Sequence, residues 1–262
     1  MIEIAELLNL KGKTAVVTGA VGIGFGIAYR LAEAGASVVL ASLYQEEVDE
    51  SVKKLSEKGF RVTGVKCDVS NEEEVRGMVG TAINSYGAID ILVNNAGIYP
   101  LVPISKMTTA DFEKVIDVNL KGVFLCTKYV SEQMINKGNG GKIINVTSVD
   151  ALHPSSVGLA HYDASKHGVW GFTKNAALEL AQYKIWVNAI APGAILTPGV
   201  EKSQPTDGQV DKNTLANFLA KVPMGRMGEI DEIGKAALFL ASNMSSYMTG
   251  AQMVVDGGRL LS

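Results

Sequence analysis

The chain has 262 residues, of which 47% are hydrophobic and 19% are charged, and its formal net charge is −3. This balance is typical of a packed globular protein and excludes a disordered or collagen-like chain. The small negative charge argues against a broad nucleic-acid-binding surface, and no apolar run reaches the roughly 18 residues that a membrane-spanning helix needs. We therefore expect neither nucleic acid nor a membrane as a partner.

The cysteines and the first residues indicate the compartment. Cys67 and Cys126 lie in apolar contexts without CxxC spacing, so we expect buried, reduced thiols rather than a disulfide or a metal site. The first ten residues carry Glu3 and Glu6 and lack the basic start of a secretory signal. These features favour a cytoplasmic protein that holds no metal.

Seven short apolar runs alternate with helical patterns along the chain. They are Thr14–Thr18, Ser37–Ser42, Val62–Cys67, Ile89–Asn94, Lys142–Thr147, Ile185–Ile190 and Gln252–Asp256. Most are apolar at nearly every position, which is typical of strands covered on both faces, as in a parallel sheet. The segments between them are long enough for crossover helices. The pattern predicts an α/β fold with one doubly wound, mostly parallel sheet and helices on both faces.

Local signals add a helix start and a loop. Ser70 followed by Glu73 is typical of a capping box, which predicts a helix with Ser70 as its N-cap. No linker divides the chain, so we expect one domain over residues 1–262. An irregular stretch within residues 197–222, rich in Pro, Gly, Ser and Asp near its start, predicts a lid over a substrate site.

The first strand runs directly into a glycine-rich segment that precedes a helix. Gly19, Gly22 and Gly24 permit a tight turn and a close approach of a ligand, and the free N–H groups at the start of the helix can bind a phosphate. A tight turn without any ligand explains the same glycines.

Tyr162 and Lys166 are four residues apart in a helical pattern, so they share one helix face. A phenol has a pKa near ~10, which is too high for efficient proton transfer at neutral pH, and a nearby ammonium lowers it. The hydroxyl of Ser148, just after the fifth strand, can bind the same substrate oxygen. Asn94-Asn95-Ala96-Gly97 ends the fourth strand, at the sheet edge where ligands bind. The bland alternative for Tyr162 and Lys166 is an ordinary surface pair.

Taken in chain order, these motifs resemble those of the short-chain dehydrogenase/reductase family. The resemblance spans nearly the whole chain, and the motifs that carry it are the glycine loop, Cys67-Asp68-Val69, Asn94–Gly97, Asp117-Val118-Asn119, Ser148, Tyr162 with Lys166, Pro192-Gly193 and Asp256-Gly257-Gly258. It implies a seven-stranded Rossmann-like sheet, NAD(H) or NADP(H) as the cofactor, and an enzyme acting on CH–OH groups.

The resemblance also implies roles for the matching residues. Tyr162 is the general acid in reduction and the base in oxidation, Ser148 polarises the substrate oxygen, and Lys166 binds the nicotinamide ribose. Asn119 holds a water that connects Lys166 to solvent, with helix capping as its alternative. The implied cofactor-binding residues are Gly19, Gly22, Ile23, Gly24, Ser42, Asp68, Val69, Asn95, Ala96, Gly97, Tyr162, Lys166, Pro192, Gly193, Ile195 and Thr197.

Two departures from the family pattern bear on the cofactor. The glycine loop is one residue short between Thr18 and Gly24, or one residue long if Gly24 is paired with Gly26, which leaves its phosphate contacts open. Ser42 stands where NAD-preferring members usually have Asp. The missing carboxylate removes repulsion against the 2′-phosphate of NADP(H). No Arg follows that could bind this phosphate, so we expect only a slight preference for NADP(H).

A third departure bears on the substrate. The interval from Ser148 to Tyr162 is one residue longer than the commonest family interval, and it contains Asp150 and His153 as candidate substrate contacts. These polar groups suit a sugar, a polyol or a small polar hydroxy compound. We therefore expect hydride transfer between nicotinamide and a secondary alcohol or ketone of that kind.

Two other functions stay open. The first is 3-oxoacyl-[acyl-carrier-protein] reduction, although the segment 174–179 is not markedly basic and a carrier protein is acidic. The second is a non-catalytic dinucleotide-binding sensor, which loss of Tyr162 or Lys166 would have signalled.

The remaining expectations concern structure and assembly. His161 and His167 are expected to be structural rather than catalytic, and Phe124, Met107 and Met134 are expected in the core. Family members are often tetramers, so we expect a homo-oligomer, with a tetramer favoured, paired through the helices near residues 111–137 and 162–182.

Overall fold

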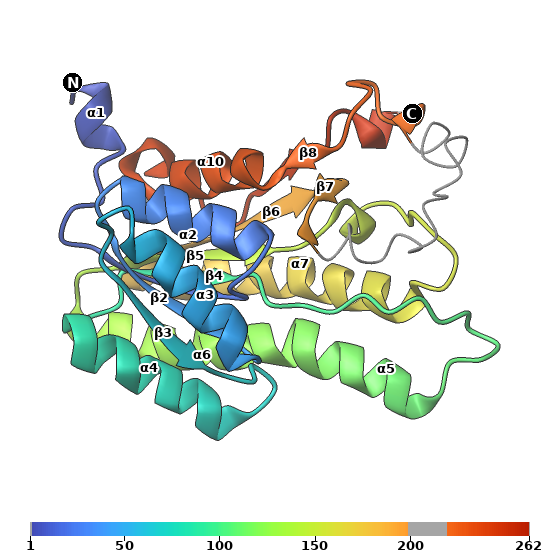
Figure 1. Cartoon of the computed structure of the whole chain (residues 1–262), viewed down its shortest axis with the longest axis horizontal. Helices are drawn as coiled ribbons and strands as arrows, with labels where there is room; N and C mark the ends of the chain where they lie inside the picture. Colours follow the sequence, from blue (N-terminus) through green and yellow to red (C-terminus); the bar gives the residue numbers. More distant parts are fainter. Residues whose placement is uncertain (1, 199–218, 262) are drawn as a thin grey trace.

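The computed structural model describes residues 2–198 and 219–261, and these build one central sheet flanked by helices (Figure 1). Every pairing in this sheet is parallel. Its seven strands, in spatial order, are β3 (Val62–Lys66), β2 (Ser37–Ser42), β1 (Thr14–Thr18), β4 (Ile91–Asn94), β5 (Gly141–Val146), β6 (Ile185–Pro192) and β9 (Gln252–Val255). The predicted doubly wound, seven-stranded Rossmann-like fold is confirmed, with strand ends within about two residues of those expected.

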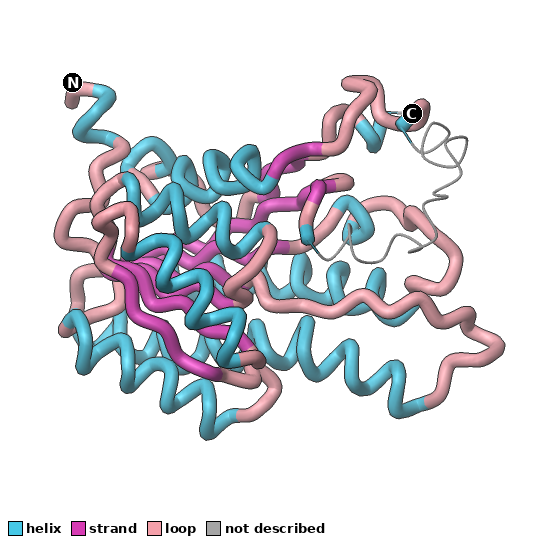
Figure 2. The backbone as a smooth tube through the Cα atoms, viewed as in Figure 1, coloured by secondary structure: helices cyan, strands magenta, loops and turns pink. Residues whose placement is uncertain are grey.

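Both faces of the sheet are covered, as Figure 2 shows by the helices around the central strands. Ala15 and Val17 of β1 pack in one apolar layer, whereas Val16 packs in the other, and all three are fully buried. Because successive side chains of a strand point to opposite faces, a sheet buried on both sides needs apolar residues at nearly every position. This explains the continuous apolar runs in the sequence.

Each layer is built from its own set of helices. On one face lie α2 (Ile23–Glu33), α3 (Gln45–Ser56) and α10 (Ile230–Ala241); on the other lie α4 (Glu72–Tyr86), α6 (Gly122–Lys137) and α7 (Ala160–Leu180). The remaining described elements are α1 (Ile4–Leu7), α5 (Thr109–Ile116), the π-helical turn η1 (Asp117–Lys121), the 3₁₀ turns η2 (Val149–Ala151), η3 (Ala181–Tyr183), η4 (Asn243–Ser245) and η5 (Arg259–Leu261), and a small parallel ladder of β7 (Ile195–Leu196) with β8 (Gly228–Glu229).

The predicted start of α4 is wrong by one residue. Asn71, not Ser70, is the N-cap: its side-chain oxygen accepts from the N–H groups of Glu73 at 3.0 Å and Glu74 at 3.4 Å. The Ser70 hydroxyl instead donates to Asp68 at 2.7 Å. This charge-assisted hydrogen bond orients the Ser70 hydroxyl toward Asp68, and the side chain of Asn71 caps the helix instead.

The residues that we expect in the core differ in how deeply they are buried. Met134 is buried as predicted, whereas Met107 is only half-buried. Cys67 and Cys126 are buried free thiols, as predicted. The expectation for Phe124 is wrong, because its side chain is 44% exposed on α6, where its ring meets Phe172 of α7 edge-on at 6.4 Å. Helical periodicity alone did not place Phe124 on the face of α6 that looks away from the sheet.

Two absences hold for the part of the chain that the structure describes. No helix in residues 2–198 and 219–261 has the length and apolarity needed to cross a membrane. Within the same ranges, no three His, Cys, Asp or Glu side chains cluster so that they could hold a metal ion. The predicted lid, residues 197–222, lies for the most part outside the described residues.

Candidate active site

The predicted site residues gather at one edge of the sheet, where the strands reach their carboxyl ends. Thr18 ends β1, Asn94 ends β4, Pro192 ends β6, and Ser148 lies two residues beyond β5. Because all these strands are parallel, their carboxyl ends form a single edge, which is where open α/β sheets bind ligands.

The glycine loop connects β1 to α2 and lies at this edge. Gly22 is the N-cap of α2, has a positive φ of 56°, and offers no side chain to the first N–H groups of the helix. A Cβ at Gly24 would lie 1.8 Å from the carbonyl oxygen of Gly19, so only glycine fits there. The uncapped N–H groups can bind an anion such as a pyrophosphate, and the helix dipole favours this.

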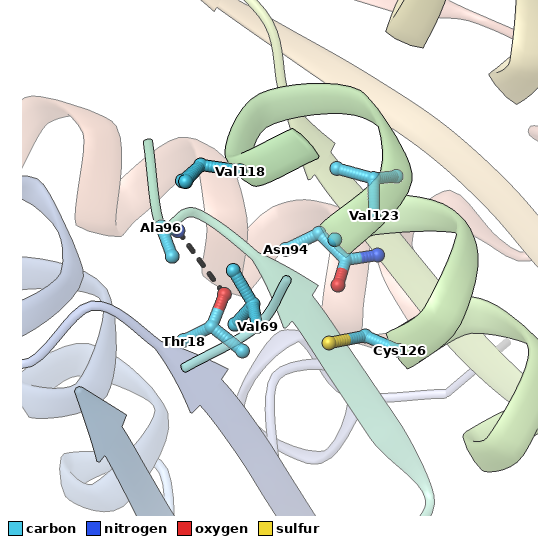
Figure 3. Close-up of a pocket in the computed structure, with 8 residues that line it drawn as sticks. Thr18, Val69, Asn94, Ala96, Val118, Val123 and Cys126 are labelled. Carbon is cyan, nitrogen blue, oxygen red and sulfur yellow. Dashed lines mark hydrogen bonds between the residues drawn. The ribbon is translucent and has the colours of Figure 1, made fainter. Parts of the chain in front are cut away.

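The end of β4 is tied to this loop through Thr18. The Thr18 hydroxyl accepts from the N–H groups of Asn95 at 3.0 Å and Ala96 at 3.1 Å, and the Asn95 side chain donates to the Thr18 carbonyl at 2.8 Å. Figure 3 shows a narrow pocket here, in which Val69 and Ala96 face each other beside Thr18. The structure therefore brings together the predicted neighbours of the adenosine.

The segment after β6 reaches the same loop from the other side. A Cβ at Gly193 would lie 2.8 Å from Asp256, so the Pro192-Gly193 and Asp256-Gly257-Gly258 motifs meet in space. A Cβ at Gly22 would lie 3.3 Å from Thr197. Ile195, which is buried in β7, holds this segment against β8. The sequence did not predict the β7–β8 ladder, because two-residue strands carry no periodic signal.

Ser42 has an acidic neighbour that sequence reasoning missed. Its hydroxyl donates to the carboxylate of Glu47, on the first turn of α3, at 2.8 Å. A carboxylate therefore does stand near the end of β2, although it comes from the following helix. Asp68, by contrast, has its carboxylate engaged by the N–H and hydroxyl of Ser70.

Ser148, Tyr162 and Lys166 converge although they come from two segments. The Lys166 ammonium lies 5.5 Å from the centroid of the Tyr162 ring and donates to the Val146 carbonyl at 2.9 Å. Ser148 is buried, and its hydroxyl lies close enough to that of Tyr162 to lower the pKa of the phenol. Tyr99, unnoticed in the sequence, packs edge-on against Tyr162 at 6.1 Å. The phenol, the ammonium and the serine hydroxyl thus form one group.

Burial governs the charges in this group. It raises the pKa of Tyr162 above its ordinary range, and the nearby carboxylate of Asp150 raises it further, while the hydrogen bond with Ser148 lowers it. This direction is opposite to the lowering that the sequence indicated from Lys166. Burial also lowers the pKa of Lys166 to about 8, which weakens its effect on the phenol. A low pKa for Tyr162 therefore needs further positive charge, such as an oxidised nicotinamide ring.

Asn119 lies in the π-helical turn between α5 and α6. It is fully buried, its side chain accepts from the Ile98 N–H at 2.8 Å, and it donates to the Ile98 carbonyl at 2.9 Å. A Cβ at Gly97 would lie 3.2 Å from the Asn119 oxygen and 3.6 Å from the Lys166 nitrogen. Gly97 therefore approaches both Asn119 and Lys166 closely, and π-helical turns are frequent at functional sites.

The two candidate substrate contacts lie in different surroundings. Asp150 is buried, and one of its carboxylate oxygens accepts from the Ser148 hydroxyl at 2.8 Å. His153 is exposed, with Nδ1 3.1 Å from the carbonyl oxygen of Pro154. Of the neighbouring histidines, His161 is fully buried, with Nδ1 accepting from the Tyr162 N–H, and His167 is exposed.

Comparison with known proteins places this chain among oxidoreductases. The family model described as enoyl-(acyl carrier protein) reductase matches residues 18–259. The chain is 39% identical to (2S)-[(R)-hydroxy(phenyl)methyl]succinyl-CoA dehydrogenase subunit BbsD of Thauera aromatica over 97% of this chain and 99% of BbsD. It is 38% identical to 3-oxoacyl-[acyl-carrier-protein] reductase FabG of Thermotoga maritima over 97% of this chain and all of FabG.

A solved structure supports the same assignment. A candidate 2-deoxy-d-gluconate 3-dehydrogenase from Agrobacterium tumefaciens, with bound NADP, superposes with a TM-score of 0.88 at 35% identity and covers 98% of this chain and 99% of that one. Relatives of this family are dehydrogenases and reductases that act on hydroxyl and keto groups and use NAD(P). The chain is a member of the short-chain dehydrogenase/reductase family.

Proposed function

We propose that this enzyme transfers a hydride between NAD(H) or NADP(H) and a secondary alcohol or ketone, with a sugar, polyol or small polar hydroxy compound as substrate. The observation that carries the proposal is the convergence of Ser148, Tyr162 and Lys166 at the carboxyl edge of the sheet, where Ser148 and Lys166 are buried and Tyr162 is half-buried. A phenol beside an ammonium and a serine hydroxyl can exchange a proton with a substrate oxygen.

Each residue of the group has a proposed step. In reduction, Tyr162 gives its hydroxyl proton to the substrate oxygen, and in oxidation its phenolate takes that proton. Ser148 polarises the substrate oxygen through its hydroxyl. Lys166 binds the nicotinamide ribose and stabilises the phenolate by its charge. When bound, the nicotinamide supplies or accepts the hydride.

Proton exchange with solvent is proposed to pass through Lys166 and Asn119. The pKa of Lys166, lowered to about 8, allows the ammonium to release and regain a proton near neutral pH. Gly97 approaches both the Asn119 oxygen and the Lys166 nitrogen closely, and a water held by Asn119 is proposed to carry the proton onward from Lys166.

The proposed cofactor site combines the glycine loop with three other segments. The N–H groups at the start of α2 would hold the pyrophosphate, with Gly19, Gly22, Ile23 and Gly24 shaping the approach. The adenosine would lie between Ser42, the pair Asp68 and Val69, and the segment Asn95–Gly97; the nicotinamide would lie against Pro192, Gly193, Ile195 and Thr197. Ser42 favours NADP(H), whereas the carboxylate of Glu47 opposes a 2′-phosphate, so we propose that Glu47 limits the preference.

A second candidate function is 3-oxoacyl-[acyl-carrier-protein] reduction. Its support is the 38% identity to FabG over the whole chain of that relative. Against it, the segment 174–179 on α7 offers one lysine and one glutamate, which is a poor match for an acidic carrier protein.

The test is a panel of ketones and alcohols, including an acyl-carrier-protein substrate, assayed with NADH, NADPH and their oxidised forms. We expect turnover of small polar hydroxy compounds and little reduction of the carrier-bound substrate. Faster reduction of the carrier-bound substrate would establish the second function. Binding of NADPH without turnover of any compound would indicate the non-catalytic sensor.

We further propose a cytoplasmic homo-oligomer, with a tetramer favoured. The supporting feature is the apolar outer face of α6 and α7, where Phe124 and Phe172 meet and Leu178 is 78% exposed. Measurement of the mass in solution by light scattering tests this proposal, and a monomer would contradict it.

A further inference from the structure

A buried carboxylate lies next to the catalytic serine and is only half satisfied. Asp150 belongs to η2, the 3₁₀ turn that follows Ser148, and its side chain is 6% exposed. Oδ2 accepts from the Ser148 hydroxyl, while Oδ1 is buried and has no hydrogen-bond partner among residues 2–198 and 219–261. Such an atom is costly to keep in a folded protein, so it needs an explanation.

The position of Asp150 determines which groups its charge affects. The carboxylate is joined to Ser148, and its charge raises the pKa of both Tyr162 and Lys166. The negative charge is therefore felt by all three groups that surround the reacting oxygen. Because Oδ1 is closed off from solvent, the oxygen that a substrate can reach is Oδ2, which lies against the Ser148 hydroxyl.

Ser148 has one hydroxyl proton, and Asp150 competes for it. The Ser148 oxygen accepts from the Asp150 N–H at 3.1 Å, and its hydroxyl donates to the Asp150 carboxylate at 2.8 Å. To polarise a substrate carbonyl, Ser148 must turn this proton away from Asp150. Among the described side chains, no other donor then remains for the carboxylate, and a buried carboxylate without a donor is strongly destabilised.

A substrate that brings its own donor removes this cost. We infer that Asp150 determines specificity by accepting a hydrogen bond from a hydroxyl on the carbon next to the reacting carbon, so that the preferred substrates are α-hydroxyketones and the vicinal diols formed from them. This inference rests on the proposed function. In reduction, the carbonyl carbon gains a hydride from the reduced nicotinamide, its oxygen gains a proton from Tyr162, and the neighbouring hydroxyl stays unchanged.

The experiment compares matched ketones that differ by this hydroxyl alone. The pairs are cyclohexanone with 2-hydroxycyclohexanone and 2-butanone with 1-hydroxy-2-butanone, assayed for kcat/KM with NADH and NADPH. We expect the wild type to prefer the hydroxyketone by roughly 10- to 100-fold in at least one pair, as for a hydrogen bond to a charged group. Asp150→Ala should reduce this ratio to within about threefold and raise kcat/KM for the plain ketone, because Ser148 keeps its proton for the carbonyl.

A matched control removes a different carboxylate near the site. Asp163 lies on α7 next to Tyr162, is partly buried, and also has an oxygen without a partner in the described residues. Asp163→Asn should leave the hydroxyketone ratio unchanged. Asp150→Asn keeps the shape of the side chain and loses the charge, so it should reduce the ratio while NADPH binding, followed by fluorescence, shows that the protein is folded.

The outcomes separate this inference from the proposed function. It is overturned if the wild type prefers the plain ketones or shows no preference, if Asp150→Ala keeps the wild-type ratio, or if Asp163→Asn changes the ratio equally. The last result would assign the effect to the net charge of the site. Failure of the proposed function has a different signature, namely bound NADPH with no turnover of any ketone in the wild type.

Discussion

Two buried aspartates lie at opposite edges of the sheet and differ in how they are satisfied. Asp90, just before β4, is 7% exposed, and Asp150, beyond β5, is 6% exposed. One Asp90 oxygen is shared by Lys13 at 3.5 Å and Lys137 at 3.3 Å, and the other accepts from the Thr14 N–H at 2.9 Å. Asp150 has Ser148 as its one side-chain donor in the described ranges, and a free oxygen.

The different pairing of Asp90 and Asp150 distinguishes a stabilising edge of the sheet, at the amino ends of the strands, from a reactive edge at their carboxyl ends. At the amino ends of the strands, a buried charge is fully paired and ties β1, β4 and α6 together. At the carboxyl ends, polar atoms of Asp150, His161 and Asp163 stay unpaired within the described structure. Unpaired buried groups cost stability, and such strained groups are concentrated at functional sites.

The largest effect is expected for Tyr162→Phe at the reactive edge. Removing the hydroxyl removes the proton donor, so kcat should fall by about 10³-fold. The NADPH dissociation constant and the melting temperature should stay close to wild type, because the Lys166 contacts remain. The matched control is Tyr183→Phe on the partly exposed surface, which should leave kcat unchanged. Retained turnover in Tyr162→Phe would remove this residue from the mechanism.

Alanine substitutions at Asp90 and at Asp150 test whether the two aspartates differ in their effect on stability. Asp90→Ala leaves the Thr14 N–H and two lysines without their acceptor, so it should lower the free energy of unfolding by about 3 kcal/mol with kcat/KM unchanged. Asp150→Ala should change the free energy of unfolding by less than about 1 kcal/mol, because it also removes an unpaired buried charge. Urea denaturation measures both. Equal destabilisation by the two variants would contradict the distinction between the edges.

The preference for NADH or NADPH is expected to depend on the charges near Ser42. Glu47→Gln removes the carboxylate beside Ser42 and should shift the kcat/KM ratio about tenfold toward NADPH, whereas Ser42→Asp adds a charge and should shift it toward NADH by a similar factor. Glu46→Gln, on the exposed side of the same helix turn, is the control that should leave the ratio unchanged. An unchanged ratio in both Glu47→Gln and Ser42→Asp would show that the 2′-phosphate lies elsewhere.

The smallest effect concerns Lys142, at the start of β5. Its ammonium donates to Ser245, and burial lowers its pKa to about 8. Between about pH 8 and the ordinary lysine pKa of about 10.4, the unfolded chain binds more protons at Lys142 than the folded chain does. The contribution of Lys142 to the free energy of unfolding therefore rises with pH in this range. The wild type should therefore gain about 1 kcal/mol relative to Lys142→Met between pH 7 and pH 10.

The control for this titration is Lys53→Met, on the exposed surface of α3. Its unfolding free energy should follow that of the wild type across the same pH range. A wild type that loses stability relative to Lys142→Met as the pH rises would contradict the lowered pKa of Lys142.

The sequence predicted the sheet well because burial on both faces leaves a strong signal. Val16 and Val17 must both be apolar, whichever layer each joins. The same reasoning missed the β7–β8 ladder, which is too short to show a period, and misplaced Phe124, whose exposure depends on which side of α6 the sheet covers. The N-cap of α4 was one residue off because Asp68 takes the hydroxyl of Ser70.

For the candidate site, the sequence indicated which residues to examine but not how they pair. The spacing of Tyr162 and Lys166 fixed their shared helix face, and the long interval after Ser148 drew attention to Asp150. The bond between Ser42 and Glu47 depends on the turn into α3, and the contact of Tyr99 with Tyr162 joins distant segments. The pKa of Tyr162 could not be inferred from its neighbours in sequence, because burial has the largest effect on it.

In the proposed mechanism, Tyr162 and Ser148 together bind the oxygen that changes between alcohol and carbonyl. The most direct measurement is a crystal structure of the enzyme with oxidised cofactor and a vicinal diol. We predict that one diol oxygen lies within hydrogen-bond distance of both the Tyr162 hydroxyl and the Ser148 hydroxyl, with its carbon against the nicotinamide ring. A Tyr162 hydroxyl that points away from the diol while the cofactor is bound would contradict the account.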